Sequence, residues 1–175
     1  ELIEEIAEEE GVEHVVKDLE HVTRSANHLL GLINDILDFS KLNAGKLELF
    51  LEPLELDVFL QEIRPLGEVL AKSKGNELVC ELRTSASGHV ITDTKRLRQI
   101  ALTLLSNAAK FTENGTITLR IYDLAEEPAS TWVLEVEDTG IGMSIEEQRR
   151  VFDQFEQAAD DTSIKYGGTG LGLSL

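Results

Sequence analysis

Polar side chains of types that suit phosphate and metal chemistry recur along one side of a segment that should be helical, residues 94–112. A solvated helix face is usually rich in Glu and Lys, whereas the middle of this one is Thr and Asn, which are weak helix formers. Their oxygen atoms can coordinate a hard cation or bind phosphate, and a lysine adds positive charge. Spacing alone supports a ligand site and a solvated face equally. The stripe is formed by Arg96, Gln99, Thr103, Asn107 and Lys110.

A carboxylate stands at the end of the predicted strand TWVLEVED. Apolar residues from Trp132 to Val136 alternate onto one face of this strand, and Asp138 has the same parity. We therefore expect the Asp138 carboxylate to point into the apolar interior, where a carboxylate is costly unless it is paired. Gly140 and Gly142 follow directly. This arrangement suits an acceptor for an amino group on a flat ring, and the alternative is an ordinary turn, where Asp and Gly are common.

The segment KYGGTGLGLSL carries glycines at alternate positions, Gly168, Gly170 and Gly172. It is neither a Walker A loop nor the G-x-G-x-x-G dinucleotide fingerprint. Helical spacing resumes after the glycines, and backbone N–H groups at a helix start can bind an anion. Lys165 adds positive charge just upstream. Glycine loops are common, so this pattern alone does not decide for phosphate.

The elements that must position these side chains fall into two units, with the boundary near residues 43–46. In the first unit, Gly11 separates a short acidic segment from a long predicted helix whose apolar residues form an a/d heptad seam. The short segment is its natural antiparallel neighbour, and two such hairpins from two chains would make a four-helix bundle. The seam consists of Val12, Val15, Leu19, Val22, Ala26, Leu29, Ile33 and Ile36.

After residue 46 strands and helices mix, which indicates an α+β unit. KLELFLEPLEL predicts a strand ended by Pro53, and Pro65 predicts a kink or break in a helix over residues 57–74. Further strands are expected at ELVCELR, HVITD, GTITLRIYDL and STWVLEVED. The helix over residues 94–112 should bury a second stripe, formed by Leu97, Ile100, Ala101, Leu104, Leu105 and Ala108.

Charge and composition exclude some partners. The 175 residues carry a formal net charge of −17, which argues against nucleic acid and anionic membrane, because both need a positive face. The single cysteine, Cys80, cannot form an internal disulfide, and its alternation with two leucines indicates a small core residue. No apolar run could span a bilayer and no signal peptide is visible, so we expect a cytoplasmic location. A full-length protein could still carry a membrane anchor upstream.

Taken together and in order, these segments resemble the sensor histidine kinases. RLRQIALTLLSNAAKFT resembles the asparagine box of that family, EDTGIGM its first glycine box, VFDQFEQ its phenylalanine box and GGTGLGL its second glycine box. HLLGLINDILDFSKLNAGKLEL resembles the end of the dimerisation helix and its link to the ATP domain. Four motifs in the family's order and at similar intervals make the match specific.

The resemblance implies two domains. Residues 1–43 would be a partial dimerisation and phosphotransfer hairpin, which forms a dimeric four-helix bundle. Residues 46–175 would be an α/β-sandwich ATP-binding domain of the histidine kinase and gyrase type, without its last helix and strands. The segment from about residue 153 to 169 resembles the mobile lid over ATP, with the glycines as its hinge.

The resemblance also implies ATP and magnesium as cofactors. Asp138 would accept a hydrogen bond from the adenine amino group, Asn107 would coordinate magnesium, and Lys110 and Lys165 would approach the phosphates. Phe111 and Tyr166 would flank the nucleotide. The complete implied nucleotide-binding set is Asn107, Lys110, Phe111, Asp138, Gly140, Gly142, Lys165, Tyr166, Gly168, Thr169, Gly170, Leu171 and Gly172.

Two departures from the family pattern bear on activity. Thr103 stands one turn before Asn107, where the family usually has another asparagine, so metal and phosphate contacts could be weaker. The family's phosphoacceptor histidine is followed by an acidic residue and, a few residues on, by a proline. No catalytic acceptor is therefore expected in this chain, because that setting is missing at His14, His21, His28 and His89.

We therefore expect the ATP-binding part of a two-component sensor histidine kinase, which donates the γ-phosphoryl group of ATP to a histidine on another chain. Expected partners are a second copy, through the helical hairpin, and a response regulator or receiver domain, with no nucleic acid and no direct membrane contact. Two alternatives stay open. One is a degenerate module that binds nucleotide or dimerises without phosphotransfer. The other, against which the hairpin and phenylalanine box argue, is an ATPase of the gyrase or heat-shock chaperone type.

Overall fold

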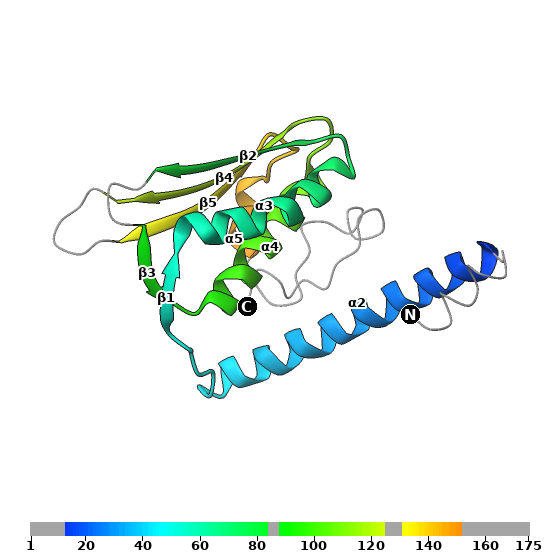
Figure 1. Cartoon of the computed structure of the whole chain (residues 1–175), viewed down its shortest axis with the longest axis horizontal. Coiled ribbons are helices and arrows are strands. Elements are labelled where there is room, and N and C mark those ends of the chain that lie inside the picture. Colours follow the sequence, from blue (N-terminus) through cyan, green and yellow to red (C-terminus); the bar gives the residue numbers. More distant parts are fainter. Residues whose placement is uncertain (1–12, 84–87, 125–130, 152–175) are drawn as a thin grey trace. The chain divides into compact units, whose positions relative to one another are not determined.

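The computed structural model describes residues 13–83, 88–124 and 131–151 (Figure 1). The chain separates into two compact units, and the division falls after Leu47. The predicted acidic segment before Gly11, the phenylalanine box and the second glycine box lie outside the described residues. None of the described helices is long and apolar enough to cross a membrane.

The described part of the first unit is helix α2 (Glu13–Asn43). A glycine ends this helix, because Gly45 adopts a φ of +63° and its backbone N–H donates to the Leu42 carbonyl at 3.0 Å. The N–H of Lys46 donates to the Lys41 carbonyl at 2.9 Å. This pair of bonds is a Schellman motif, which needs a left-handed residue that glycine adopts without steric cost.

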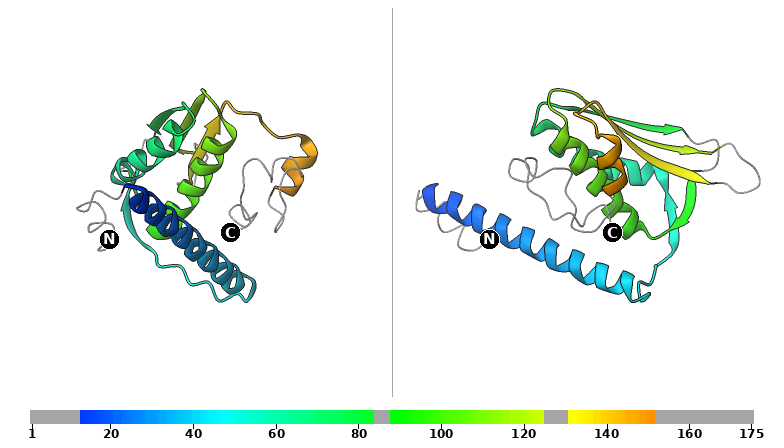
Figure 2. Two further views of the ribbon diagram at one scale, coloured as in Figure 1. Left: turned by 90° about the vertical axis from the view of Figure 1, so that its right-hand side faces the viewer. Right: turned by 180° about the vertical axis from the view of Figure 1, so that it is seen from behind.

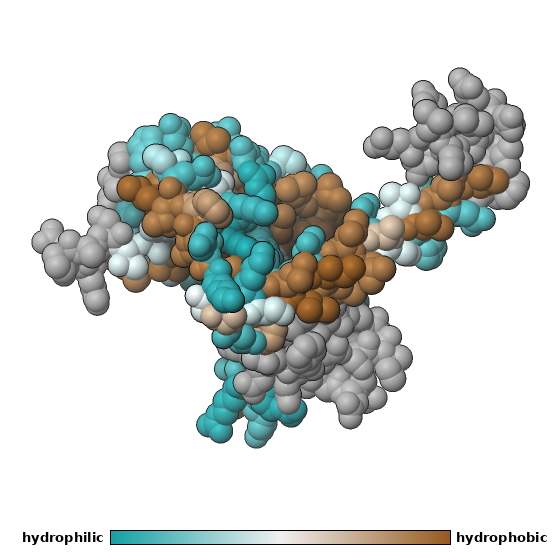
Figure 3. Space-filling model, turned by 90° about the horizontal axis from the view of Figure 1, so that it is seen from below, coloured by the Kyte–Doolittle hydropathy of each residue, from teal (hydrophilic) through white to brown (hydrophobic). Residues whose placement is uncertain are grey.

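The heptad seam of α2 is exposed in the single chain from Val22 to Ile36. Val22 is 65 % exposed, and the apolar side chains at Leu29, Ile33 and Ile36 are exposed as well. Figure 3 shows apolar side chains, in brown, at the surface along this helix. A contiguous apolar stripe of this kind marks a surface that another surface covers.

The second unit is built on a three-stranded mixed sheet in the order β2–β4–β5. Strand β2 (Glu77–Arg83) runs parallel to β4 (Thr116–Asp123), and β4 pairs antiparallel with β5 (Trp132–Asp138). Strand β4 is central and carries alternate buried residues. The four strands predicted from ELVCELR onward are all present, and three of them form this sheet.

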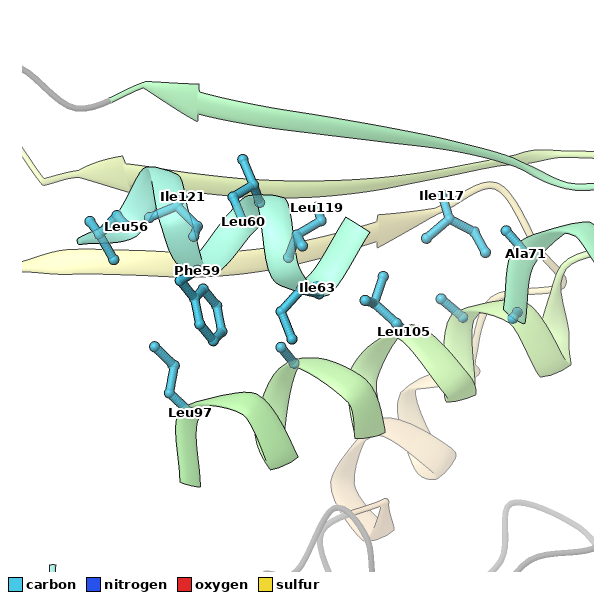
Figure 4. Close-up of a cluster of buried hydrophobic side chains, with 13 residues drawn as sticks. Leu56, Phe59, Leu60, Ile63, Ala71, Leu97, Leu105, Ile117, Leu119 and Ile121 are labelled. Atoms are coloured by element: carbon cyan, nitrogen blue, oxygen red, sulfur yellow. The ribbon is translucent and has the colours of Figure 1, made fainter. Parts of the chain in front are cut away.

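Helices α3 (Leu56–Lys72) and α4 (Thr94–Phe111) cover one face of the sheet (Figure 2). The core lies between the two layers, and a fully buried side chain of this size contributes about 1.5–3 kcal/mol relative to exposure. The predicted α+β sandwich is confirmed. Figure 4 shows the core side chains that meet there, which include Phe59, Ile63, Leu97, Leu105, Ile117, Leu119 and Ile121.

The strand predicted to end at Pro53 is displaced. Residues 46–51 form no strand, and β1 (Glu52–Glu55) contains Pro53. Among the described strands it pairs with β3 (His89–Thr92), antiparallel, with Pro53 opposite Ile91. Both strands of a two-stranded sheet are edge strands, where the missing N–H of proline is tolerated.

Pro65 does not break α3, and the prediction that Ile100 is buried was wrong. Helix α3 continues through Pro65, which is exposed, so the carbonyl of Gln61 that loses its donor lies on the solvent side. Ile100 was placed in the buried stripe of α4, but its side chain is 51 % exposed. The buried stripe is narrower and consists of Leu97, Ala101, Leu105, Ala108 and Ala109.

Candidate functional site

The polar stripe of α4 lies at the edge of the core. Asp93 begins the helix, because its carboxylate accepts hydrogen bonds from the backbone N–H groups of Arg96 and Phe50, each at 3.0 Å. These two bonds lower the pKa of the Asp93 carboxyl group. A fully solvated face would be exposed along its length, so the half-buried state of the stripe favours a ligand site. The half-buried members are Arg96, Gln99, Thr103, Asn107 and Lys110.

The last two turns of α4 carry the amide of Asn107 and the ammonium group of Lys110, three residues later on the polar stripe. The Asn107 side chain is half-buried and makes no hydrogen bond to another described residue. The Lys110 ammonium group lies 4.8 Å from the centroid of the Phe111 ring. Burial, and then the like charge of Lys74, lowers the pKa of Lys110. A partly desolvated cation of this kind favours an anionic ligand.

Two segments meet where α4 ends. The Thr112 hydroxyl donates to Asp138 Oδ1 across 3.3 Å, and the backbone N–H of Gly140 donates to the same oxygen at 2.9 Å. The backbone N–H of Ile141 donates to the Phe111 carbonyl at 3.2 Å. The structure therefore brings together the end of the asparagine box and the first glycine box, as expected for one site.

The predicted burial of Asp138 was wrong. The parity argument holds for the strand, because Trp132, Leu134 and Val136 pack against the core. Asp138, however, is the last residue of β5, which lies at the edge of the three-stranded sheet, and is exposed. Its carboxylate is held by the hydroxyl and N–H donors described above and not by burial.

Two glycines follow Asp138 for different reasons. A Cβ on Gly140 would lie 2.3 Å from the Phe111 carbonyl oxygen and 2.8 Å from both Asp138 Oδ1 and Thr112 Oγ1. Gly142 has open space around it but adopts a φ of +67°, which L side chains rarely adopt. Only glycine fits the first position without displacing the carboxylate.

A short helix, α5 (Ile145–Arg150), follows the first glycine box. Ser144 and Glu147 form a capping box at its start, with the Ser144 N–H donating to Glu147 Oε2 at 2.7 Å. Hydrogen bonds from Ser144 lower the pKa of Glu147. The predicted lid and the remaining predicted site residues lie outside the described residues: Lys165, Tyr166, Gly168, Thr169, Gly170, Leu171 and Gly172.

Sequence reasoning missed one buried residue at this site, Asn76, which is 5 % exposed. Its Nδ2 donates to the Thr112 carbonyl at 2.8 Å, and its Oδ1 accepts from the Gly115 N–H at 2.9 Å. An asparagine after Gly75 indicates only a turn before a strand. No local pattern could identify partners more than 30 residues further along the chain.

Residues 92–175 match the family described as Histidine kinase-, DNA gyrase B-, and HSP90-like ATPase. The chain is 43 % identical over 158 residues to the signal transduction histidine-protein kinase BarA of Escherichia coli strain K12, over 90 % of this chain and 17 % of that relative. The chain is homologous to the sensor histidine kinases. It is also 42 % identical over 155 residues to the sensor histidine kinase GacS of Pseudomonas protegens, over 88 % of this chain and 17 % of that relative.

Solved histidine kinases share this fold. Full-length ShkA in complex with AMPPNP has a TM-score of 0.69 and 34 % identity, over 86 % of this chain and 30 % of that chain. The fold expected from the resemblance to the sensor histidine kinases is thereby confirmed. The relatives named here are histidine kinases, which favours that branch of the family over the gyrase and chaperone branches. The chain spans 17 % of the length of both curated relatives.

Proposed function

We propose that this chain binds ATP and magnesium at the end of α4 and donates the γ-phosphoryl group to a histidine other than the four in its own sequence. The observation that carries this proposal is the meeting of Asp138, Gly140 and the end of α4 beside a half-buried polar stripe. Homology to the sensor histidine kinases supports the same site.

Each described side chain has a distinct task in this proposal. Asp138 accepts a hydrogen bond from the adenine amino group, and Phe111 packs beside the nucleotide. Lys110 places positive charge near the phosphates, where a partly desolvated ammonium group acts more strongly than in water. The predicted residues from Lys165 to Gly172 would complete the phosphate contacts.

The donor set on α4 fits magnesium bound mainly through phosphate oxygens. No group of three or more His, Cys, Asp or Glu side chains in the described ranges could hold a metal ion. Magnesium in phosphoryl-transfer sites usually keeps several waters and takes few protein ligands besides the phosphates. Asn107 would supply an amide oxygen, with the Thr103 hydroxyl one turn earlier, and the bound ion would neutralise developing phosphate charge.

The partners follow from the exposed seam and from the family. We propose that a second copy covers the apolar stripe of α2 and that the whole protein acts with a response regulator or receiver domain. Replacing Leu29 and Ile33 with Asp would place charges in the seam, and both side chains are exposed in the single chain. Sedimentation of the chain as a dimer, and of this variant as a monomer, would support the proposal. A wild-type monomer at high concentration would refute it.

A second candidate is a module that binds nucleotide without transferring phosphate. Thr103 favours it, because a threonine lacks the amide that the family usually places there. The two candidates differ in one measurable product, the phosphohistidine on a partner chain.

The deciding experiment incubates the chain with radiolabelled ATP, magnesium and a separate dimerisation domain that carries an acceptor histidine. Acid-labile, base-stable label on that domain supports the kinase, and nucleotide binding without label supports the binding module. Asp138→Asn should weaken nucleotide binding by about tenfold or more, since it removes the negative charge from the side chain that accepts a hydrogen bond from the adenine amino group. Asp57→Asn is the matched control, because Asp57 is exposed on α3 and accepts from Gln61.

A further inference from the structure

One buried side chain, Asn76, holds both sides of the turn between α4 and β4. Its amide donates to the Thr112 carbonyl on one side and accepts from the Gly115 N–H on the other, at 2.8 Å and 2.9 Å. Both ends of the amide are therefore satisfied inside the protein, and removing it would leave one buried and one partly buried backbone group without their partner. The side chain fixes the position of Thr112 relative to the start of β4.

Backbone bonds to the same segment strengthen this arrangement. The N–H of Asn114 donates to the Lys74 carbonyl at 3.1 Å, and the N–H of Glu77 donates to the Gly115 carbonyl at 2.9 Å. Asn114 has a φ of +51°, a left-handed conformation that asparagine tolerates better than most residues. Hydrogen bonds thus anchor the turn, through Thr112, Asn114 and Gly115, to residues 74–77.

Thr112 carries this anchoring to the carboxylate of Asp138. Its side chain is 1 % exposed and β-branched, so its χ1 angle is stiff, and its hydroxyl lies 3.3 Å from Asp138 Oδ1. The Gly140 N–H donates to the same oxygen, whereas Oδ2 makes no hydrogen bond to another described residue. The two donors orient the carboxylate so that Oδ2 is the oxygen left to accept from outside.

We infer that Asn76 and Thr112 are positioning residues that orient the Asp138 carboxylate and thereby set the preference for adenine over 6-oxopurines. This inference rests on the proposed function, because it deepens the role proposed there for Asp138. Adenine offers a 6-amino donor to Oδ2, whereas hypoxanthine offers a 6-oxo acceptor that a carboxylate repels. An oriented carboxylate discriminates between the two, and a carboxylate free to rotate discriminates less.

The test compares ADP with IDP, which differ at the 6-position of the base, in titration calorimetry with magnesium and the full chain. The wild-type chain should bind ADP about tenfold to a hundredfold more tightly than IDP, as a hydrogen bond to a charged group predicts. In Thr112→Val the ratio of the ADP affinity to the IDP affinity should fall to within about threefold of unity, because ADP binds more weakly while the IDP affinity is nearly unchanged. Thr112→Ser should restore the ratio, because serine keeps the hydroxyl.

Two further variants separate positioning from folding. Thr118→Val is the matched control, because Thr118, on β4, is buried like Thr112 but makes no hydrogen bond to Asp138, and it should keep the wild-type ratio. Asn76→Asp keeps the acceptor for Gly115 and loses the donor to Thr112, so its ratio should also fall. If Asn76→Asp does not fold, Thr112→Val decides alone, with folding checked by circular dichroism.

The outcomes distinguish this inference from the proposed function. A Thr112→Val chain that weakens ADP and IDP equally, at an unchanged ratio, would overturn the inference and leave nucleotide binding intact. Failure of the wild-type chain to bind either nucleotide would overturn the proposed function together with the inference. Equal wild-type binding of ADP and IDP would refute the adenine contact of Asp138, and with it the inference, while nucleotide binding would stand.

Discussion

The backbone of Gly140 lies against the carbonyl of Phe111, so closely that a Cβ on Gly140 would come within 2.3 Å of that oxygen. The neighbouring N–H of Ile141 donates to the same carbonyl at 3.2 Å. The loop after β5 is therefore joined to the last turn of α4 through main-chain atoms. Asp138 directly precedes that loop and Lys110 belongs to that helix, so these main-chain contacts set the distance between the two ends of the proposed site.

Gly140→Ala should separate these two segments. The added methyl group would also lie 2.8 Å from Asp138 Oδ1, so the carboxylate must move. We expect ATP affinity to fall by about tenfold or more, because misplacing a positioned group by even 1 Å is costly. Gly31→Ala in α2, where nothing lies within 4 Å of the added methyl, is the control and should not weaken binding. An unchanged affinity of Gly140→Ala, measured by calorimetry, would show that the close contact is unimportant.

Lys110 makes nucleotide binding sensitive to alkaline pH. Burial lowers its pKa below the ordinary 10.5, so the ammonium group loses its proton at a lower pH than a free lysine does. ATP affinity should therefore decline as the pH rises through this lowered pKa. The ATP affinity of Lys110→Arg should decline less as the pH rises, since a guanidinium group stays charged. Equal declines in both proteins between pH 7 and about 10 would assign the effect to another group.

Glu135 makes the second unit sensitive to acid. On the sheet face opposite the helices, Arg120 donates to Glu135, Glu81 and Glu137, and the Tyr122 hydroxyl donates to Glu135 at 3.1 Å. The bond from Arg120, and then that from Tyr122, lowers the pKa of Glu135 below its ordinary 4.5. A lowered carboxyl pKa stabilises the fold above the unfolded value and loses that stabilisation as the pH falls through the folded value.

Glu135→Gln should therefore make the melting temperature less dependent on pH in the acidic range. The wild-type melting temperature should drop as the pH falls below 4.5, and the variant should lose less over the same interval. Thermal melts followed by circular dichroism from neutral pH to about pH 3 test this. Acid limbs of identical slope would mean that the Arg120 cluster does not contribute to the pH dependence.

Cys80 should react slowly in the folded protein. It packs against the core, and burial raises the pKa of its thiol, although nearby Arg64 opposes the shift. The thiolate is the reactive form, so at neutral pH native Cys80 should react with a disulfide reagent at least about tenfold more slowly than in denaturant. Comparable rates in both states, followed by absorbance, would contradict the core position that the alternating leucines predict.

The sequence by itself determined the elements and the parts of the site. Heptad spacing predicted α2 and period-two alternation predicted the strands, whereas the resemblance of the asparagine and glycine boxes to those of the sensor histidine kinases predicted that Lys110 and Asp138 share one site. The helices and strands are readable because they depend on the regular spacing of side chains within one element. The spacing of side chains within a short segment is enough to reveal these elements.

Only the tertiary structure decided how these parts meet. The exposure of Asp138 depends on its place at the end of the edge strand β5, and the exposure of Ile100 depends on how widely α4 contacts its neighbours. Asn76 and Thr112 come together across 36 residues, through a turn that neither segment encodes alone. Hydrogen bonds between distant segments follow from packing, so the orientation of the carboxylate could not be derived from any periodic pattern in the chain.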